Sequence, residues 1–130
     1  MIRILIVDDH EDAADSLGKV LRLMGHNVEV AYSASAALAR LDRFSPDLFL
    51  LDLKLPDMDG YELARRLRQV ARKEAKFVAV SGYPPGIGGD LADNLFDGHV
   101  VKPMGPEVLL QVLRVWRGPD SRDNGTTDAS

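Results

Sequence analysis

The sequence contains no cysteine, which excludes disulfides, thiolate metal sites and cysteine nucleophiles. It also lacks a basic excess: 16 lysines and arginines stand against 20 acidic residues, for a net charge of -4. Nucleic-acid binding through phosphates needs a basic surface, so we expect no nucleic-acid partner. No apolar run approaches the roughly 20 residues of a membrane helix, and the start MIRILIVDDH turns acidic too soon for a signal peptide. We therefore expect no membrane association and a reducing, cytoplasmic location.

The composition is that of one globular domain. The 130 residues are 45% hydrophobic and 28% charged, which suits a single core. Residues 118–130 have almost no apolar side chain, so this segment cannot offset its own ordering entropy. We predict a folded domain over residues 1–117 and a flexible polar tail over residues 118–130.

Short apolar runs alternate five times with stretches of helical spacing. Continuous apolar runs are typical of strands that are buried on both faces of a parallel sheet. The predicted strands are 3–9, 27–32, 47–52, 76–82 and 98–103, and the predicted helices are 12–26, 33–44, 59–70, 90–96 and 104–116. This order predicts an α/β fold, a doubly wound five-stranded parallel sheet with helices on both faces. Such sheets bind ligands at the carboxyl ends of their strands.

Apolar residues three or four positions apart predict the buried face of each helix. They are Leu17, Val20, Leu21 and Met24 in the first helix, which Gly25 ends, and Leu63, Leu67 and Val70 in the third. The stretch over residues 84–89 is rich in proline and glycine, which both disfavour helix interiors. We therefore expect a short or irregular fourth helix.

Polar residues stand where four of the predicted strands end. These are Asp8 and Asp9, Asp52, Ser81, and Lys102. Since the ends of parallel strands meet at one edge, three carboxylates would lie together and repel one another, and a divalent cation would remove that cost. Oxygen ligands suit Mg²⁺, with Mn²⁺ as an alternative. A cation, a lysine and a hydroxyl around a nucleophilic carboxylate indicate phosphoryl transfer.

Other acids and histidines have simpler interpretations. Asp57 and Asp59 follow the third strand and are predicted to be turn and cap residues rather than metal ligands. His10, His26 and His99 have no recognised metal-ligand spacing. We expect His99 to be structural.

The sequence resembles receiver domains of two-component response regulators over roughly residues 2–117, and four blocks carry the resemblance. They are ILIVDDHEDAADSL, LLDLKLPDMDGYELARRLR, VAVSGY and VVKPMGPEVLL, in the family's order and at suitable spacing. The segments EDAADSL and DGYELARRLR, within the first two blocks, most resemble the receivers of hybrid sensor kinases. The resemblance implies a flavodoxin-like fold with strand order 2-1-3-4-5.

The resemblance also implies roles for the acids. Asp52 would be the phosphoacceptor. Asp9 and Asp8 would form the acidic pair that binds Mg²⁺ together with Asp52, with Asp9 the more direct ligand. The backbone carbonyl of Lys54 would complete the protein ligands.

The remaining implied residues belong to a conformational switch. Ser81 would follow the phosphoryl group on activation, and Lys102 would pair with a phosphoryl oxygen, with a cis bond to Pro103. The family usually has an aromatic residue three positions before the lysine, where this chain has His99. A histidine can pack and hydrogen-bond there, but it also titrates near neutral pH.

The implied partners are a histidine kinase or histidine phosphotransfer protein, and an unknown downstream protein or attached domain. Enzymatic activity would be limited to self-phosphorylation and self-dephosphorylation. Two alternatives stay open. A small-molecule aspartyl phosphatase usually has a second acid two positions after the first, where this chain has Lys54. A receiver-like module could instead bind proteins without being phosphorylated.

Overall fold

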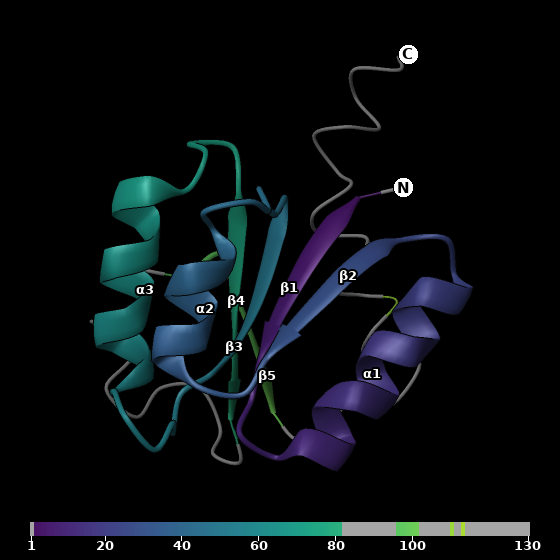
Figure 1. Cartoon of the computed structure of the whole chain (residues 1–130), viewed down its shortest axis with the longest axis horizontal. Helices are drawn as coiled ribbons and strands as arrows, with labels where there is room; N and C mark the ends of the chain where they lie inside the picture. Colours follow the sequence, from purple (N-terminus) through teal and green to yellow (C-terminus); the bar gives the residue numbers. More distant parts are fainter. Residues whose placement is uncertain (1, 82–95, 102–109, 111–112, 114–130) are drawn as a thin grey trace.

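A parallel five-stranded sheet forms the centre of the molecule (Figure 1). The computed structural model describes residues 2–81, 96–101, 110 and 113. The strands are β1 (Arg3–Val7), β2 (Asn27–Ala31), β3 (Leu48–Asp52), β4 (Lys76–Ser81) and β5 (Gly98–Val101). Their order is β2-β1-β3-β4-β5, and every neighbouring pair is parallel. The predicted α/β fold class and strand order are confirmed.

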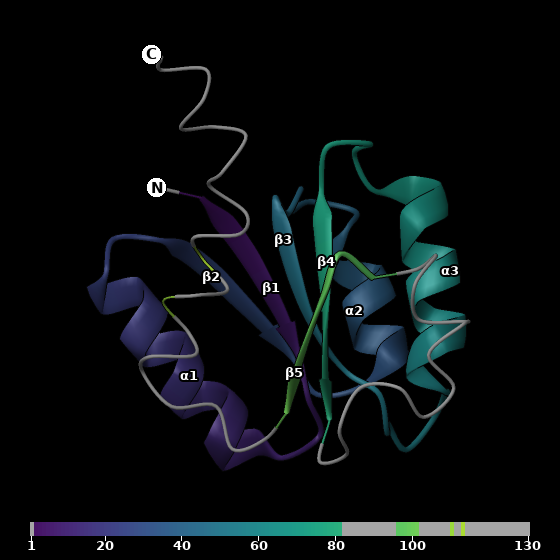
Figure 2. The same cartoon turned by 180° about the vertical axis from the view of Figure 1, so that it is seen from behind.

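Three described helices cover the two faces of the sheet. They are α1 (Glu11–Leu23), α2 (Ala34–Arg40) and α3 (Gly60–Val70). Figures 1 and 2 show α1 on one face, with α2 and α3 together on the other. No described helix is both long and apolar enough to cross a membrane. The predicted fourth helix, most of the last helix and the polar tail lie outside the described residues.

Alternate side chains along the strands pack into two separate hydrophobic cores, one on each face of the sheet. In β1, Ile4 and Ile6 pack with the cluster on the α1 side, whereas Leu5 and Val7 pack with the cluster under α2 and α3. This two-sided burial explains why β1 and β3 are continuous apolar runs. Leu113, from the predicted last helix, is buried in the cluster on the α1 side.

The buried face of α1 differs from the prediction. Its buried residues are Ala14, Gly18 and Leu21, with Leu17 partly buried, while Val20 and Met24 are 44% and 41% exposed. A Cβ added to Gly18 would lie 3.2 Å from a Val30 methyl group, so the small residues let α1 approach β2 closely. The predicted stripe was therefore wrong at Val20 and Met24. Gly25 ends α1 with a φ of +96°, as predicted.

The same correction applies to α3. Its buried residues are Gly60, Leu63, Ala64 and Leu67, whereas Val70 is 64% exposed. Val70 is the last residue of the helix. The predicted face was therefore right for the leucines and wrong for Val70.

Candidate functional site

Two acids lie side by side at the carboxyl edge of the sheet. Val7 of β1 pairs with Leu51 of β3, so the next residues, Asp8 and Asp52, follow one step further along adjacent strands. Asp8 is 9% exposed and Asp52 is 5% exposed. The two carboxylates therefore lie at the carboxyl ends of apolar strands, at the edge of the hydrophobic core.

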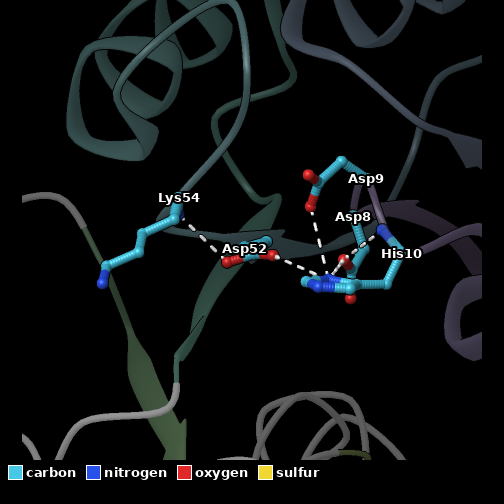
Figure 3. Close-up of polar contacts among 5 residues, drawn as sticks. All are labelled: Asp8, Asp9, His10, Asp52 and Lys54. Atoms are coloured by element: carbon cyan, nitrogen blue, oxygen red, sulfur yellow. Dashed lines mark hydrogen bonds and ion pairs between the residues drawn. The ribbon is translucent and has the colours of Figure 1, made fainter.

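These two acids belong to a four-residue cluster. Potential metal-binding atoms of Asp8, Asp9, His10 and Asp52 all lie within 4.8 Å of one another (Figure 3). Like charges this close repel, and partial burial weakens the screening by water. The cluster is thus a place where a cation is favoured, and its carboxylate oxygens are ligands of the kind that Mg²⁺ prefers.

The backbone after β3 folds against Asp52. The Lys54 amide donates a hydrogen bond of 3.0 Å to Oδ1 of Asp52. The Lys54 side chain points away from the acids in Figure 3. Lys54 thus contacts Asp52 through its backbone amide. The assignment of its backbone carbonyl to the metal stays a prediction.

Gly60 makes this folding possible. A Cβ at Gly60 would lie 2.6 Å from the Leu53 Cα and 2.9 Å from the backbone oxygen of Asp52. The Gly60 amide instead donates to the Leu53 carbonyl at 3.0 Å. This glycine is needed for space at the end of β3, where the start of α3 passes close to the strand.

Asp57 and Asp59 cap helices, as predicted. The Asp57 carboxylate accepts hydrogen bonds from the amides of Ala34 and Ser35, at 2.9 and 3.1 Å, at the start of α2. These bonds hold the pKa of Asp57 below its usual value, and the bond from the Ala34 amide has the largest effect. Asp59 is the N-cap of α3 and accepts from the Tyr61 amide at 2.7 Å.

His10 is the member of the cluster that the sequence analysis missed. Its Nδ1 lies 3.1 Å from Oδ1 of Asp8, 3.3 Å from Oδ1 of Asp9 and 4.0 Å from Oδ2 of Asp52. The available signal was its position directly after the acid pair. The statement that the three histidines form no metal trio still fits the contacts, because His26 accepts from the Ile2 amide and His99 contacts Ser81.

Ser81 and His99 meet on neighbouring strands. Ser81 ends β4 and is 5% exposed, and its Oγ lies 3.3 Å from Nε2 of His99 in β5. Partial burial lowers the pKa of His99. The neutral ring is therefore favoured, and it can either donate to the hydroxyl or accept from it. Lys102 and its bond to Pro103 lie outside the described residues.

The comparison with known families decides what kind of domain this is. The model of the response regulator receiver domain matches residues 4–114. This chain belongs to the response regulator receiver domain family. It is therefore a receiver domain of two-component signal transduction, a family of signalling domains. Receiver domains of this kind interact with histidine kinases.

Individual relatives agree with this assignment. The sensory transduction protein RegX3 of Mycolicibacterium smegmatis is 34% identical, covering 98% of this chain and 57% of that protein. A sensor histidine kinase, AtsR of Burkholderia thailandensis, is 33% identical over 81% of this chain and 18% of its own length. A CheY-like receiver domain protein from Methanospirillum hungatei superposes with a TM-score of 0.84 at 32% identity, covering 96% of this chain and 99% of that one.

The chain spans about half the length of several curated relatives that it matches, with 44% of the transcriptional regulatory protein TrcR and 57% of RegX3. The matches include both a transcriptional regulator and a sensor kinase. The closer likeness to receivers of hybrid kinases therefore stays a prediction.

Proposed function

We propose that this receiver domain takes a phosphoryl group from the phosphohistidine of a histidine kinase or phosphotransfer protein onto Asp52, in a reaction that depends on Mg²⁺. The observation that carries the proposal is the convergence of Asp8, Asp9 and Asp52 within one cluster at the carboxyl edge of the sheet. Asp52 has the least exposed side chain of the three, 6% against 13% for Asp8 and 36% for Asp9. A shielded carboxylate beside two more exposed acids suits a nucleophile beside metal ligands.

In the proposed reaction, an Asp52 carboxylate oxygen forms a bond to phosphorus. The bond from phosphorus to the donor imidazole breaks, and its electron pair stays on that nitrogen. The product is an acyl phosphate on Asp52. When bound, Mg²⁺ neutralises charge on the acids and on the phosphoryl oxygens. We assign its protein ligands to Asp9, Asp8, Asp52 and the Lys54 carbonyl, and Mn²⁺ fits the same oxygen donors.

Phosphorylation would then shift the population between two surface arrangements. We assign Ser81 and Lys102 to the phosphoryl oxygens, and His99 to the position that responds when Ser81 moves. The contact between Ser81 and His99 supports this coupling, because it joins the hydroxyl to the ring at 3.3 Å across the neighbouring strands β4 and β5. The changed surface would be read by a downstream protein or an attached domain.

The proposal is tested by intact-mass spectrometry after incubation with Mg²⁺ and acetyl phosphate as phosphodonor. Wild-type protein should gain the mass of one phosphoryl group, and Asp52→Asn should gain none. The matched control is Asp57→Asn, which removes a carboxylate in the loop that follows Asp52. The Asp57 carboxylate accepts its hydrogen bonds from amides of α2. The control should be phosphorylated like the wild type, and chelation of the metal should stop the reaction in both proteins.

A wild-type protein that gains no mass would contradict the proposal and favour the module that binds proteins without phosphorylation. Rapid turnover of small phosphate esters that Asp52→Asn abolishes would instead favour the phosphatase alternative. The role of Lys102 has its own test: Lys102→Ala should impair the phosphorylated response more than it impairs Mg²⁺ affinity. Equal loss of both would contradict the assignment.

A further inference from the structure

We propose that His10 is an additional metal ligand of the acid cluster, through Nδ1, and that it gives the site a preference for metals that accept nitrogen ligands, such as Zn²⁺, over Mg²⁺. This inference rests on the proposed metal site, and it adds a residue that determines which ion is held.

The His10 side chain is not used for capping. His10 is the N-cap residue of α1, a position where a side-chain oxygen usually accepts a hydrogen bond from the first turn. His10 makes no side-chain cap bond. Its ring is instead directed at the carboxylates of Asp8, Asp9 and Asp52 (Figure 3). The imidazole therefore makes its hydrogen bond to the acid cluster and not to the first turn of the helix.

The distances fit coordination of a shared ion. Octahedral ligands at about 2.1 Å from a metal lie about 3.0 Å apart when adjacent and about 4.2 Å apart when opposite. The Nδ1 atom lies 3.1 and 3.3 Å from oxygens of Asp8 and Asp9, and 4.0 Å from an oxygen of Asp52. Nδ1 is at hydrogen-bond distance from Oδ1 of Asp8, and the same nitrogen also faces Asp9 and Asp52, so an ion shared by the four residues would take the place of that bond.

The ring is also placed so that it can adjust to an ion. The His10 side chain is 70% exposed, while the Asp52 side chain is 6% exposed. Asp52 is thus fixed by the surrounding core, and His10 approaches from the solvent side, where a small rotation of the ring costs little packing.

The nitrogen changes which metal the site prefers. Mg²⁺ selects oxygen ligands and binds imidazole poorly, whereas imidazole is a good ligand for Zn²⁺, Ni²⁺ and Cu²⁺. An all-oxygen site and the same site with His10 would therefore hold Mg²⁺ about equally, but they would differ in their affinity for Zn²⁺. His10 is in this sense a residue that determines specificity for the ion.

The test compares Zn²⁺ and Mg²⁺ binding by isothermal titration calorimetry at about pH 8, where free imidazole is neutral. His10→Ala and His10→Gln should each weaken Zn²⁺ binding at least about tenfold, the lower end of the loss seen when metal sites lose a supporting group. The same variants should change Mg²⁺ affinity by less than about threefold. The matched control is Glu11→Gln, which alters the next residue, exposed in the first turn of α1, and should affect both ions alike.

A second readout identifies the ligand directly. Ring-nitrogen NMR of the wild-type protein should show a Zn²⁺-dependent shift of the His10 Nδ1 signal, with the rings of His26 and His99 unaffected. The inference is overturned if the His10 variants leave Zn²⁺ affinity unchanged, weaken the binding of both ions equally or strengthen the binding of either ion. It is also overturned if the ring-nitrogen signal of another histidine shifts instead.

The outcomes also separate this inference from the proposed function. If wild-type protein binds Mg²⁺, and Asp9→Asn weakens that binding while the His10 variants do not alter Zn²⁺, then the metal site stands and His10 is not its ligand. If neither Asp9→Asn nor Asp52→Asn changes binding of either ion, then the proposed metal site itself is wrong.

Discussion

Replacing Gly60 with alanine tests how tightly α3 is packed against the strand that carries Asp52. The added Cβ would lie 2.6 Å from the Leu53 Cα, 2.9 Å from the Asp52 carbonyl oxygen and 3.0 Å from the Leu53 carbonyl oxygen. Non-bonded carbon atoms pack at about 3.5–4.0 Å, so the backbone must move by roughly 1 Å. All three neighbours are backbone atoms, so no change of rotamer can relieve the clash.

The expected cost follows from two opposing terms. Overpacking of this kind costs about 1–3 kcal/mol. In a helix interior alanine would recover about 0.5–1 kcal/mol through its better helix propensity, and it recovers less at Gly60, the first residue of α3. We expect Gly60→Ala to lower the free energy of unfolding by roughly 1–2 kcal/mol, or Tm by about 4–8 °C for a domain of this size.

The measurement is urea and thermal denaturation of Gly60→Ala beside Gly98→Ala. A Cβ at Gly98 would lie 3.6 Å from a Val78 methyl group, an ordinary contact. This control should change stability by less than about 0.5 kcal/mol. The shift at Gly60 should also displace Asp52 and slow its phosphorylation by up to about a hundredfold. A Gly60→Ala protein that is as stable as the wild type and is phosphorylated as fast would refute the packing argument.

Three further predictions concern charge at the edge of the sheet. Without metal, Asp52→Asn should be at least as stable as the wild type in a thermal melt, because it removes one of three clustered negative charges; a clear loss of stability would contradict the crowding of these acids. Mg²⁺ at about 100 times its dissociation constant should stabilise the wild type by about 2.7 kcal/mol, and Asp9→Asn should lose most of this gain at the same Mg²⁺ concentration. The lowered pKa of His99 means that the folded protein binds this proton less readily than the unfolded chain does. The wild type should therefore lose stability relative to His99→Phe as the pH falls through about 6.5 toward the lower folded pKa; parallel pH profiles would show that burial of His99 has no such effect.

The edge of the sheet could be predicted because it follows from the order of elements along the chain. In β1 and β3, which are adjacent and parallel, an acid comes directly after the apolar run. The backbone pairing of the two strands therefore brings Asp8 and Asp52 together, whichever rotamers their side chains adopt. The caps at Asp57 and Asp59 could be predicted for a similar reason, since short acidic side chains after a strand readily bond to nearby amides. The helix that Asp57 caps was not evident, because its partner is α2 and not the following helix.

Other features depend on contacts that the sequence pattern does not encode. The orientation of the His10 ring depends on its rotamer and on three carboxylates from two strand ends. The exposure of Val20 and Met24 depends on how closely α1 approaches the sheet at Gly18. Helical spacing gives the direction of an apolar face, but the small residues decide where along that face the contact is made.

The start of α2 depends on a residue that comes 23 positions later in the chain. With only seven residues, α2 is far too short to be stable as an isolated helix. The Ser33 side chain caps the Ala36 amide locally, but the amides of Ala34 and Ser35 gain Asp57 as their acceptor only when the segment after β3 is in place. We expect α2 to mature late in folding. Hydrogen exchange at these two amides should accelerate in Asp57→Ala while exchange in β1 is unchanged, and equal protection in both proteins would mean that α2 forms without this link.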